Sequence, residues 1–268
     1  MTPLLKPLTA SLLILMSAIT PLYAASSAWV DLGGGKARLV ADYDPASGNL
    51  KSVIEVKLKN GWSTYWRYPG STGIPPRFDF SASKHVSFNP VAFPTPSLQK
   101  SGDAYYAGYK KSVLFPVDGK VTQNQLPDLN LDMLIGVCEE ICIPAQANFG
   151  ISADKFQQSD PVAKRIISFA KLNMPETMKA SDIGLEMHRL SETSLKIEFA
   201  FALSDEKPAL FVEGPSNWYL TPAKFKSSNN GKLTFHLDLT GIPKGAVINS
   251  GDLNFTLVVG RKGFEIRD

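Results

Sequence analysis

Short runs in which apolar and polar residues alternate recur along most of the chain. In residues 50–58, for example, Ile54, Val56 and Leu58 point one way if the chain is extended, while Glu55 and Lys57 point the other. A period of two is the pattern of a β-strand with unlike faces. It predicts strands over residues 37–41, 50–58, 77–80, 86–90, 112–117, 129–137, 147–151, 185–190, 195–203, 209–213, 223–226, 233–239 and 255–259.

One segment, residues 160–173, follows a helical spacing instead. Asp160 is suited to the N-cap position and Pro161 to the first helical position. Pro175 ends the apolar periodicity. We therefore expect a single short helix between two β-rich halves.

The spacing of the strands predicts the architecture. Strands separated by turns every 8–12 residues or so, without helices between them, are typical of β-sandwiches. We expect an all-β protein with two β-sandwich domains, residues 27–155 and 180–268, joined by a helical linker over residues 156–179. Asn229-Asn230-Gly231 predicts a tight hairpin turn in the second domain.

The first 24 residues have the features of a cleaved secretory signal. Lys6 is their sole charge, an apolar run covers residues 12–19, and small residues follow at Ala24, Ala25 and Ser26. The run is far shorter than the ~20 residues that a membrane span requires. An uncleaved signal anchor is the alternative. We expect a soluble, exported, periplasmic protein in a compartment where disulfides persist.

Composition excludes several classes of function. The chain of 268 residues has a net charge of +3 with acids and bases mixed, so it shows no nucleic-acid footprint. The three histidines at positions 85, 188 and 236 are too scattered for a histidine-rich metal site. No serine-histidine-acid set stands out, and the glycines at 33–35 lack the Lys-Ser/Thr of a phosphate loop.

The two cysteines, Cys138 and Cys142, are the chemical signal, because they lie only four positions apart. A disulfide between them would close a loop of about five residues, which constrains the unfolded chain little and makes a poor staple. Such a pair suits thiol–disulfide exchange, in which one thiol attacks and the second resolves the mixed disulfide. Two alternative interpretations of the pair stay open, namely a structural disulfide and a Cu(I) site formed by both thiolates with Met133 nearby.

Three segments carry a resemblance to a known family. They are Cys-Glu-Glu-Ile-Cys-Ile-Pro-Ala (138–145), Gly-Tyr-Lys-Lys-Ser-Val-Leu-Phe-Pro-Val (108–117) and Gly-Trp-Ser-Thr-Tyr-Trp-Arg-Tyr-Pro-Gly (61–70). Over residues 30–152 the chain resembles the periplasmic N-terminal domain of DsbD-type thiol:disulfide interchange proteins. The Cys-x-x-x-Cys spacing fits the ScsB-like branch, which is associated with copper tolerance. The C-terminal half resembles the second β-domain of ScsB-like proteins.

The resemblance implies an immunoglobulin-like sandwich with the two cysteines on neighbouring strands. It implies a reductase component that takes electrons from a membrane thiol reductase of the ScsB or CcdA type and passes them to periplasmic thioredoxin-fold proteins. No organic cofactor is implied. The sequence contains no transmembrane module and no thioredoxin Cys-x-x-Cys, so the relay would need partner proteins. The alternatives remain a Cu(I)-binding protein or an adaptor with a non-catalytic disulfide.

Family position also suggests roles for individual residues. Cys142 would be the attacking thiol and Cys138 the resolving thiol. Residues 102–108 would form a cap loop, with Asp103 orienting it and Tyr105 or Tyr106 lying over the sulfurs. The concentration of aromatics before Pro69-Gly70 suggests that Tyr65 and Trp66 form one wall of the site, with a place in the sandwich core as the alternative. Pro144 is also assigned to the site, where it would hold the chain after Cys142 extended, and a simple edge-strand position is its alternative.

The charged residues near these segments are harder to interpret. Glu139 and Glu140 either point to solvent or approach the sulfurs and raise the pKa of the thiols. Arg67 either binds a carboxylate or extends along apolar surface to reach water, and we favour the second.

Overall fold

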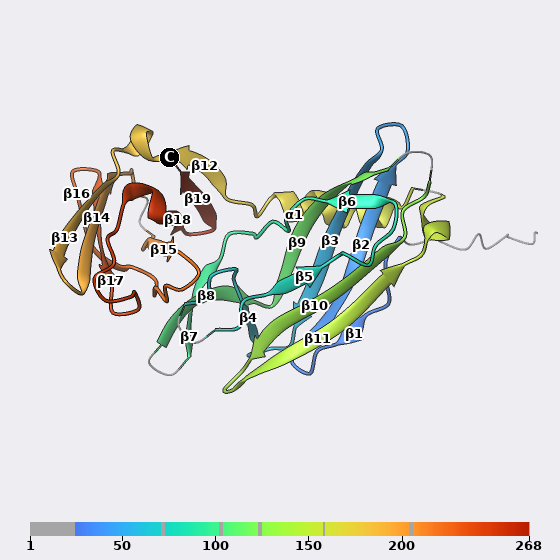
Figure 1. The fold of residues 1–268 in the computed structure, drawn as a ribbon, viewed down its shortest axis with the longest axis horizontal. Helices are drawn as coiled ribbons and strands as arrows, with labels where there is room; N and C mark the ends of the chain where they lie inside the picture. Colours follow the sequence, from blue (N-terminus) through green and yellow to red (C-terminus); the bar gives the residue numbers. More distant parts are fainter. Residues whose placement is uncertain are drawn as a thin grey trace, which may run out of the picture.

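The computed structural model describes residues 25–70, 73–101, 104–122, 125–157, 159–203 and 206–267. The expected signal segment, residues 1–24, and Asp103 lie outside these residues. The described chain forms two lobes along one long axis (Figure 1). Strands β1–β11 build the N-terminal lobe, strands β12–β19 build the C-terminal lobe, and helix α1 lies between them in the chain.

The N-terminal lobe consists of two sheets. The first has the order β1-β2-β3-β9-β6, with strands Val30–Asp31, Gly35–Asp44, Asn49–Leu58, Ser112–Val121 and Val86–Phe88. The second has the order β11-β10-β4-β8-β7, with strands Cys142–Ile151, Leu129–Cys138, Ser63–Tyr65, Ala104–Lys110 and Ser97–Ser101. Strand β5 (Arg77–Asp79) also pairs with β10 in this sheet.

The core of this lobe forms where the two sheets face each other. Alternate residues of β10, among them Leu131, Met133 and Ile135, are at most 2% exposed. They pack in one cluster with residues of the opposite sheet such as Ile54 and Phe115. Burying each large side chain contributes roughly 1.5–3 kcal/mol. Because strand residues alternate in direction, Gly136 and Cys138 of β10 face away from this core.

Helix α1 (Pro161–Lys171) begins where the sequence predicts. The side chain of Asp160 accepts a hydrogen bond from the backbone N–H of Val162, and proline occupies the first turn. Ile167 and Ala170 pack against Val53 on the outer surface of the first sheet. The helix is therefore fastened to the N-terminal lobe as well as connecting the two lobes. A short 3-10 helix, η1 (Ala153–Phe156), precedes it.

The C-terminal lobe is a second sandwich, built from two four-stranded sheets. One has the order β12-β19-β18-β15, with strands Glu176–Lys179, Lys262–Arg267, Asn254–Val259 and Ala209–Glu213. The other has the order β13-β14-β17-β16, with strands Glu186–Ser191, Ser194–Ala200, Lys232–Asp238 and Lys224–Asn229. Two 3-10 helices, η2 (Ala180–Ile183) and η3 (Ser250–Asp252), lie between strands.

The predicted hairpin turn joins β16 to β17. Asn230 and Gly231 have φ values of 51° and 74°, the left-handed region that asparagine and glycine tolerate best. Inside this lobe the rings of Phe199 and Phe235 stack 5.8 Å apart in the core. The all-β prediction of two sandwiches with one helix between them is thereby confirmed. No helix in the described part of the chain is long and apolar enough to cross a membrane.

Candidate functional site

The cysteine pair closes the end of the β10–β11 hairpin. Cys138 is the last residue of β10, Cys142 is the first of β11, and the two are directly opposite each other in the ladder. Their Cα atoms are 4.0 Å apart and their sulfurs form a disulfide. The three residues between them, Glu139, Glu140 and Ile141, form the turn. The disulfide therefore links two neighbouring strands at one end of the sandwich.

The disulfide lies on the outer face of its sheet. Val137 points into the core, so Cys138 points outward, where it forms a small cluster with Tyr65 and Tyr106. Cys138 is only 2% exposed, whereas Cys142 is partly exposed. Met133 lies five positions before Cys138 and is buried in the core on the opposite face of the sheet. The expectation that Met133 lies near the sulfurs is therefore not met.

Tyr65 covers the exposed sulfur. Its phenolic oxygen is 2.8 Å from Sγ of Cys142, and because a disulfide sulfur carries no proton, the phenol donates this hydrogen bond. The ring of Tyr106 stands edge-on to that of Tyr65, with centroids 5.1 Å apart. Burial, and then the neighbouring Tyr106, raise the pKa of Tyr65 above its usual value of 10.0. Tyr65 is thus a protonated donor at neutral pH.

A polar network attaches strand β4 to the cysteine strand. The hydroxyl of Tyr106 lies 2.7 Å from Oγ of Ser63, and Ser63 in turn donates to the carbonyl of Cys138 at 3.3 Å. The hydroxyl of Thr64 donates to the carbonyl of Gly136 at 2.7 Å. These bonds fix the backbone from which Tyr65 projects.

Two glycines make room for the Tyr65 ring. A Cβ atom on Gly136 would lie 2.9 Å from carbons of this ring, and so would a Cβ on Gly73. Ile74 completes the packing around the site. The ring of Tyr65 is therefore held between the backbone of Gly136 and that of Gly73, which leaves it little freedom to move.

The cap expected over residues 102–108 is largely a strand. Residues 104–108 belong to β8, which pairs with β7 on one side and with β4 on the other. Because neighbours in a strand face opposite ways, Tyr106 is buried at the site and Tyr105 is 51% exposed beside Lys100. Only one of the two candidate tyrosines thus reaches the cysteines. Asp103 falls outside the described residues.

Trp66 and Pro144 lie away from the sulfurs. Trp66 follows Tyr65 and faces the opposite way, so it is 1% exposed in the main core and contacts Phe211. Pro144 is exposed on the edge strand β11, opposite Gly136. An edge position suits proline, which has no N–H to donate to the ladder. Neither side chain lines the cysteine site as expected.

The rim of the site is apolar and acidic. Glu139 and Glu140 are both exposed, in keeping with the solvent-facing interpretation. Ile141 is 77% exposed at the tip of the turn, and Ile143 is 40% exposed beside it. Both isoleucines are thus exposed at this end of the hairpin, but Ile143 lies opposite Val137 and so faces the other side of the sheet from the sulfurs.

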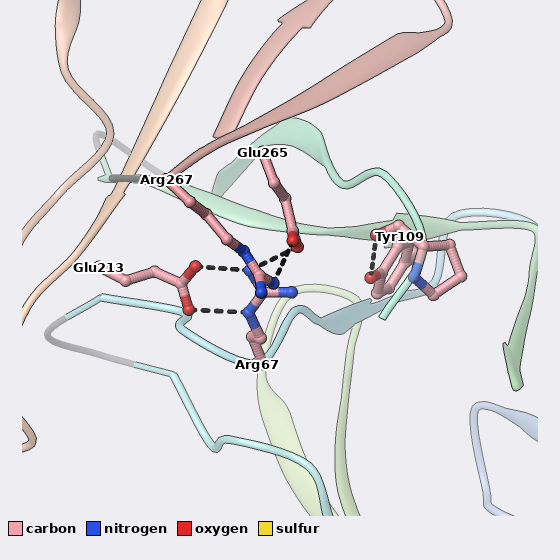
Figure 2. Close-up of polar contacts among 6 residues, drawn as sticks. Arg67, Tyr109, Glu213, Glu265 and Arg267 are labelled. Carbon is pink, nitrogen blue, oxygen red and sulfur yellow. Dashed lines mark hydrogen bonds and ion pairs between the residues drawn. The ribbon is translucent and has the colours of Figure 1, made fainter. Parts of the chain in front are cut away.

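Arg67 binds carboxylates, the interpretation of its role that the sequence favours less. Its guanidinium donates to both carboxylate oxygens of Glu213, at 2.8 and 2.6 Å, and lies 2.9 Å from Glu265 (Figure 2). Arg267 is paired with the same Glu265. Burial opposes the charge of Arg67, but the hydrogen bonds and charges of the two glutamates outweigh it and raise its pKa. The preferred interpretation, a side chain extended towards water, is wrong: Arg67 ties the two lobes together.

One group of potential metal ligands occurs in the described chain, on the C-terminal lobe. Donor atoms of Glu186, His188 and Glu198 lie within 4.8 Å of one another. The ammonium group of Lys232 lies 3.0 Å from Glu186 and 3.9 Å from Glu198. This lysine already supplies the positive charge, so the group is best explained as a surface ion-pair cluster.

The described site is a disulfide across the end of a hairpin in a β-sandwich, clustered with Tyr65 and Tyr106. Residues 36–151 match the family model described as "Thiol:disulfide interchange protein DsbD, N-terminal". The expected resemblance to that domain is thereby confirmed. Among solved structures, the chain is similar to the N-terminal periplasmic domain of ScsB from Proteus mirabilis, with a TM-score of 0.74 and 20% identity. This match covers 91% of the chain and 98% of the ScsB domain, and so extends the shared fold through both lobes. A search of curated proteins found no match.

Proposed function

We propose that this chain is a periplasmic electron-relay protein that passes reducing equivalents between a membrane thiol reductase and thioredoxin-fold partners. The observation that carries the proposal is the asymmetry of the cysteine pair. Cys142 is partly exposed and its sulfur accepts a hydrogen bond from Tyr65. Cys138, by contrast, is buried, with 2% of its surface exposed. Such a division suits exchange, because its rate depends on which sulfur is attacked and on access to that sulfur.

The reaction in the reducing direction follows from this division. The thiolate of Cys142 attacks a sulfur of the partner disulfide, forms a mixed disulfide, and releases one partner thiolate. The thiolate of Cys138 then attacks Sγ of Cys142, which restores the Cys138–Cys142 bond and releases the second partner thiolate. Two electrons and two protons pass to the partner. The chain is reduced again when a membrane dithiol of the ScsB or CcdA type performs the same steps on its disulfide.

The position of Tyr65 supports a role for the phenol in both halves of this cycle. A donor 2.8 Å from the sulfur is placed to stabilise negative charge on Cys142, both as an attacking thiolate and as a leaving group. The raised pKa of Tyr65 keeps the proton on the phenol for this purpose. Tyr65 does not itself exchange electrons.

The apolar rim supports recognition of a protein partner. Ile141 and Ile143 are exposed and flank Cys142 in the sequence, Ile141 at the tip of the turn and Ile143 on the opposite face of the strand. A partner that buries these side chains would gain hydrophobic contact area only when its own disulfide is aligned with Cys142.

Trapping variants test the proposal. Reduced Cys138→Ser protein is mixed with an oxidised thioredoxin, quenched in acid, alkylated and analysed by non-reducing electrophoresis and mass spectrometry. We expect a stable mixed disulfide through Cys142, because the resolving thiol is missing. The matched variant, Cys142→Ser, should trap far less, since Cys138 is buried. Absence of a mixed disulfide with Cys138→Ser, together with no oxidation of the wild-type dithiol, would overturn the proposal.

A further inference from the structure

A single stretch of chain links the disulfide to the C-terminal lobe. Strand β4 carries Ser63, Thr64 and Tyr65 at the site, and the next five residues, 66–70, run directly to the other lobe. We call residues 66–70 the bridge. Trp66 begins it with a backbone hydrogen bond from its N–H to the carbonyl of Ala107, at 3.0 Å, and its ring packs against Phe211.

The C-terminal lobe holds the bridge at three successive points. Arg67 pairs with Glu213 at the end of β15 and with Glu265 of β19. The hydroxyl of Tyr68 donates to the carbonyl of Trp218 at 2.5 Å and accepts from the N–H of Leu220 at 3.3 Å. Gly70, with φ of 87°, passes so close to the carbonyl of Leu220 that a Cβ would lie 3.1 Å from that oxygen. The lobe therefore grips backbone and side chains over four residues.

The ion pairs in this contact are partly shielded from water. The side chains of Arg67, Glu213 and Glu265 are 27%, 15% and 12% exposed. Bidentate pairing of a guanidinium with a carboxylate is directional as well as attractive. The two glutamates come from different strands of one sheet. Their contacts therefore fix the position of Arg67 relative to that sheet as a whole.

The chain that follows the bridge packs back onto the tyrosine. Gly73 lies against the ring of Tyr65, with Pro69 of the bridge beside it. Ile74 joins the cluster of Tyr65, Tyr106 and the two cysteines. The chain that follows the gripped residues thus packs against the ring of Tyr65, whose hydroxyl contacts Cys142.

We propose that the C-terminal lobe positions the Tyr65 lid over Cys142 through the bridge, with Arg67 as the positioning residue. This inference rests on the proposed function, because it gives the lobe without cysteines a role in the exchange site. When the lobe holds the bridge, the lid is closed and the disulfide is shielded. Displacing the lobe, as a docking partner could, would loosen the bridge and uncover the sulfur.

The rate at which a small phosphine reduces the disulfide tests the inference, because this reagent needs access to the sulfur and no protein partner. The double variant Glu213→Gln/Glu265→Gln removes the charges that hold Arg67. We expect reduction about fivefold faster or more, the lower range of coupling between two sites. The matched control is Glu198→Gln, which breaks an ion pair with Lys196 elsewhere in the same lobe and should leave the rate unchanged.

The same measurement in a Tyr65→Ala variant separates a role of the C-terminal lobe in positioning Tyr65 from a general loosening of the structure. In Tyr65→Ala protein the lid is absent, so the double variant should no longer accelerate reduction, whereas a general loss of structure would still do so. If the double variant is poorly folded by circular dichroism, Tyr68→Phe replaces it, because it removes only the hydroxyl bonded to Trp218 and Leu220. An unchanged reduction rate in a folded bridge variant, or equal acceleration without Tyr65, overturns the inference. Since no exchange partner is involved, failure here is distinguishable from failure of the trapping experiment.

Discussion

The phenolic oxygen of Tyr65 lies 2.8 Å from the sulfur of Cys142, on the outer face of a sheet whose inner face forms the core of the N-terminal lobe. This contact joins a residue of the aromatic segment to the cysteine motif across 77 positions of sequence. It places a proton donor on the sulfur of Cys142, the more exposed residue of the pair. Most of the chemistry that we expect of this chain depends on that relationship.

Removing the phenol should make Cys142 a weaker acid. In reduced Tyr65→Phe protein the ring still covers the sulfur, but the thiolate loses a charge-assisted hydrogen bond worth roughly 1.5–3 kcal/mol. We expect the pKa of the Cys142 thiol to rise by about 1 or more, measured by thiolate absorbance against pH. Tyr106→Phe is the control, because its hydroxyl contacts Ser63 and not sulfur. Equal pKa values in both variants would contradict the assigned role of Tyr65.

A methyl group on Gly136 should displace the lid. The added Cβ in Gly136→Ala would lie 2.9 Å from the ring of Tyr65, closer than carbon atoms can approach. We expect the free energy of unfolding to fall by about 1–3 kcal/mol, as for other overpacked sites, and the disulfide to react faster with a small reductant. Gly150→Ala, on the neighbouring strand, is the control, since the atoms nearest to its added Cβ would be 3.8 Å away. A faster reaction in both variants would argue against displacement of Tyr65.

Reducing the disulfide should leave the protein folded. The bond closes a loop of about five residues, for which the chain-entropy model gives a stabilisation of about 2 kcal/mol. The hairpin itself is held by the ladder between β10 and β11, which pairs ten residues of each strand. Urea denaturation with and without a reductant should show a small shift of the midpoint and retained β-structure. Unfolding upon reduction would mean that the bond is a structural staple.

Two aspartates at the β2–β3 hairpin should affect stability with opposite dependence on pH. Burial is the main cause that raises the pKa of Asp42 above 3.8, with Asp160 and Asp44 adding to it. A raised pKa in the folded state favours folding at low pH, and this contribution is lost as pH rises through the folded-state pKa. Asp42→Asn should therefore increase the free energy of unfolding at about pH 7 and change it little at about pH 3.

Asp44 is the opposite case. Hydrogen bonds from the Ser47 hydroxyl and the Ala46 N–H lower its pKa below 3.8. Its contribution is present above the unfolded pKa and is lost as pH falls through the folded value, so Asp44→Asn should destabilise the protein at neutral pH only. Denaturation curves of both variants at the two pH values check the prediction. The same sign of change for both variants at neutral pH would contradict it.

Local signals in the sequence account for the success of the fold prediction. The alternation in residues 50–58 and 129–137 reflects the strands β3 and β10, because a sandwich buries one face of each strand. Asp160-Pro161 predicts the start of α1, since the capping bond spans only two residues. Strands β4, β7 and β8 were not predicted as strands. They are short or carry aromatic residues on both faces, so no alternation marks them.

The candidate site was harder to predict at the level of single side chains. Tyr65 and Trp66 are both aromatic and adjacent in the sequence, yet their side chains point to opposite faces of the sheet. The same is true of Tyr105 and Tyr106. Deciding between neighbours requires knowing which face of the sheet meets the core and which carries the disulfide. That information comes from the pairing of β4 with both β10 and β8.

The sequence by itself determined that the chain is built of strands with one capped helix, and that its only two cysteines lie close enough to form a disulfide. These are properties of short segments, set by local periodicity, capping and spacing. Only the tertiary structure decided that the disulfide faces outward under Tyr65, and that Arg67 binds Glu213 and Glu265 of the other lobe. Those contacts join residues 77 to 198 positions apart, and no local pattern encodes them. The first contact exists because β4 pairs beside β10 in one sheet, and the second because the two sandwiches pack against each other and bring distant strand ends together.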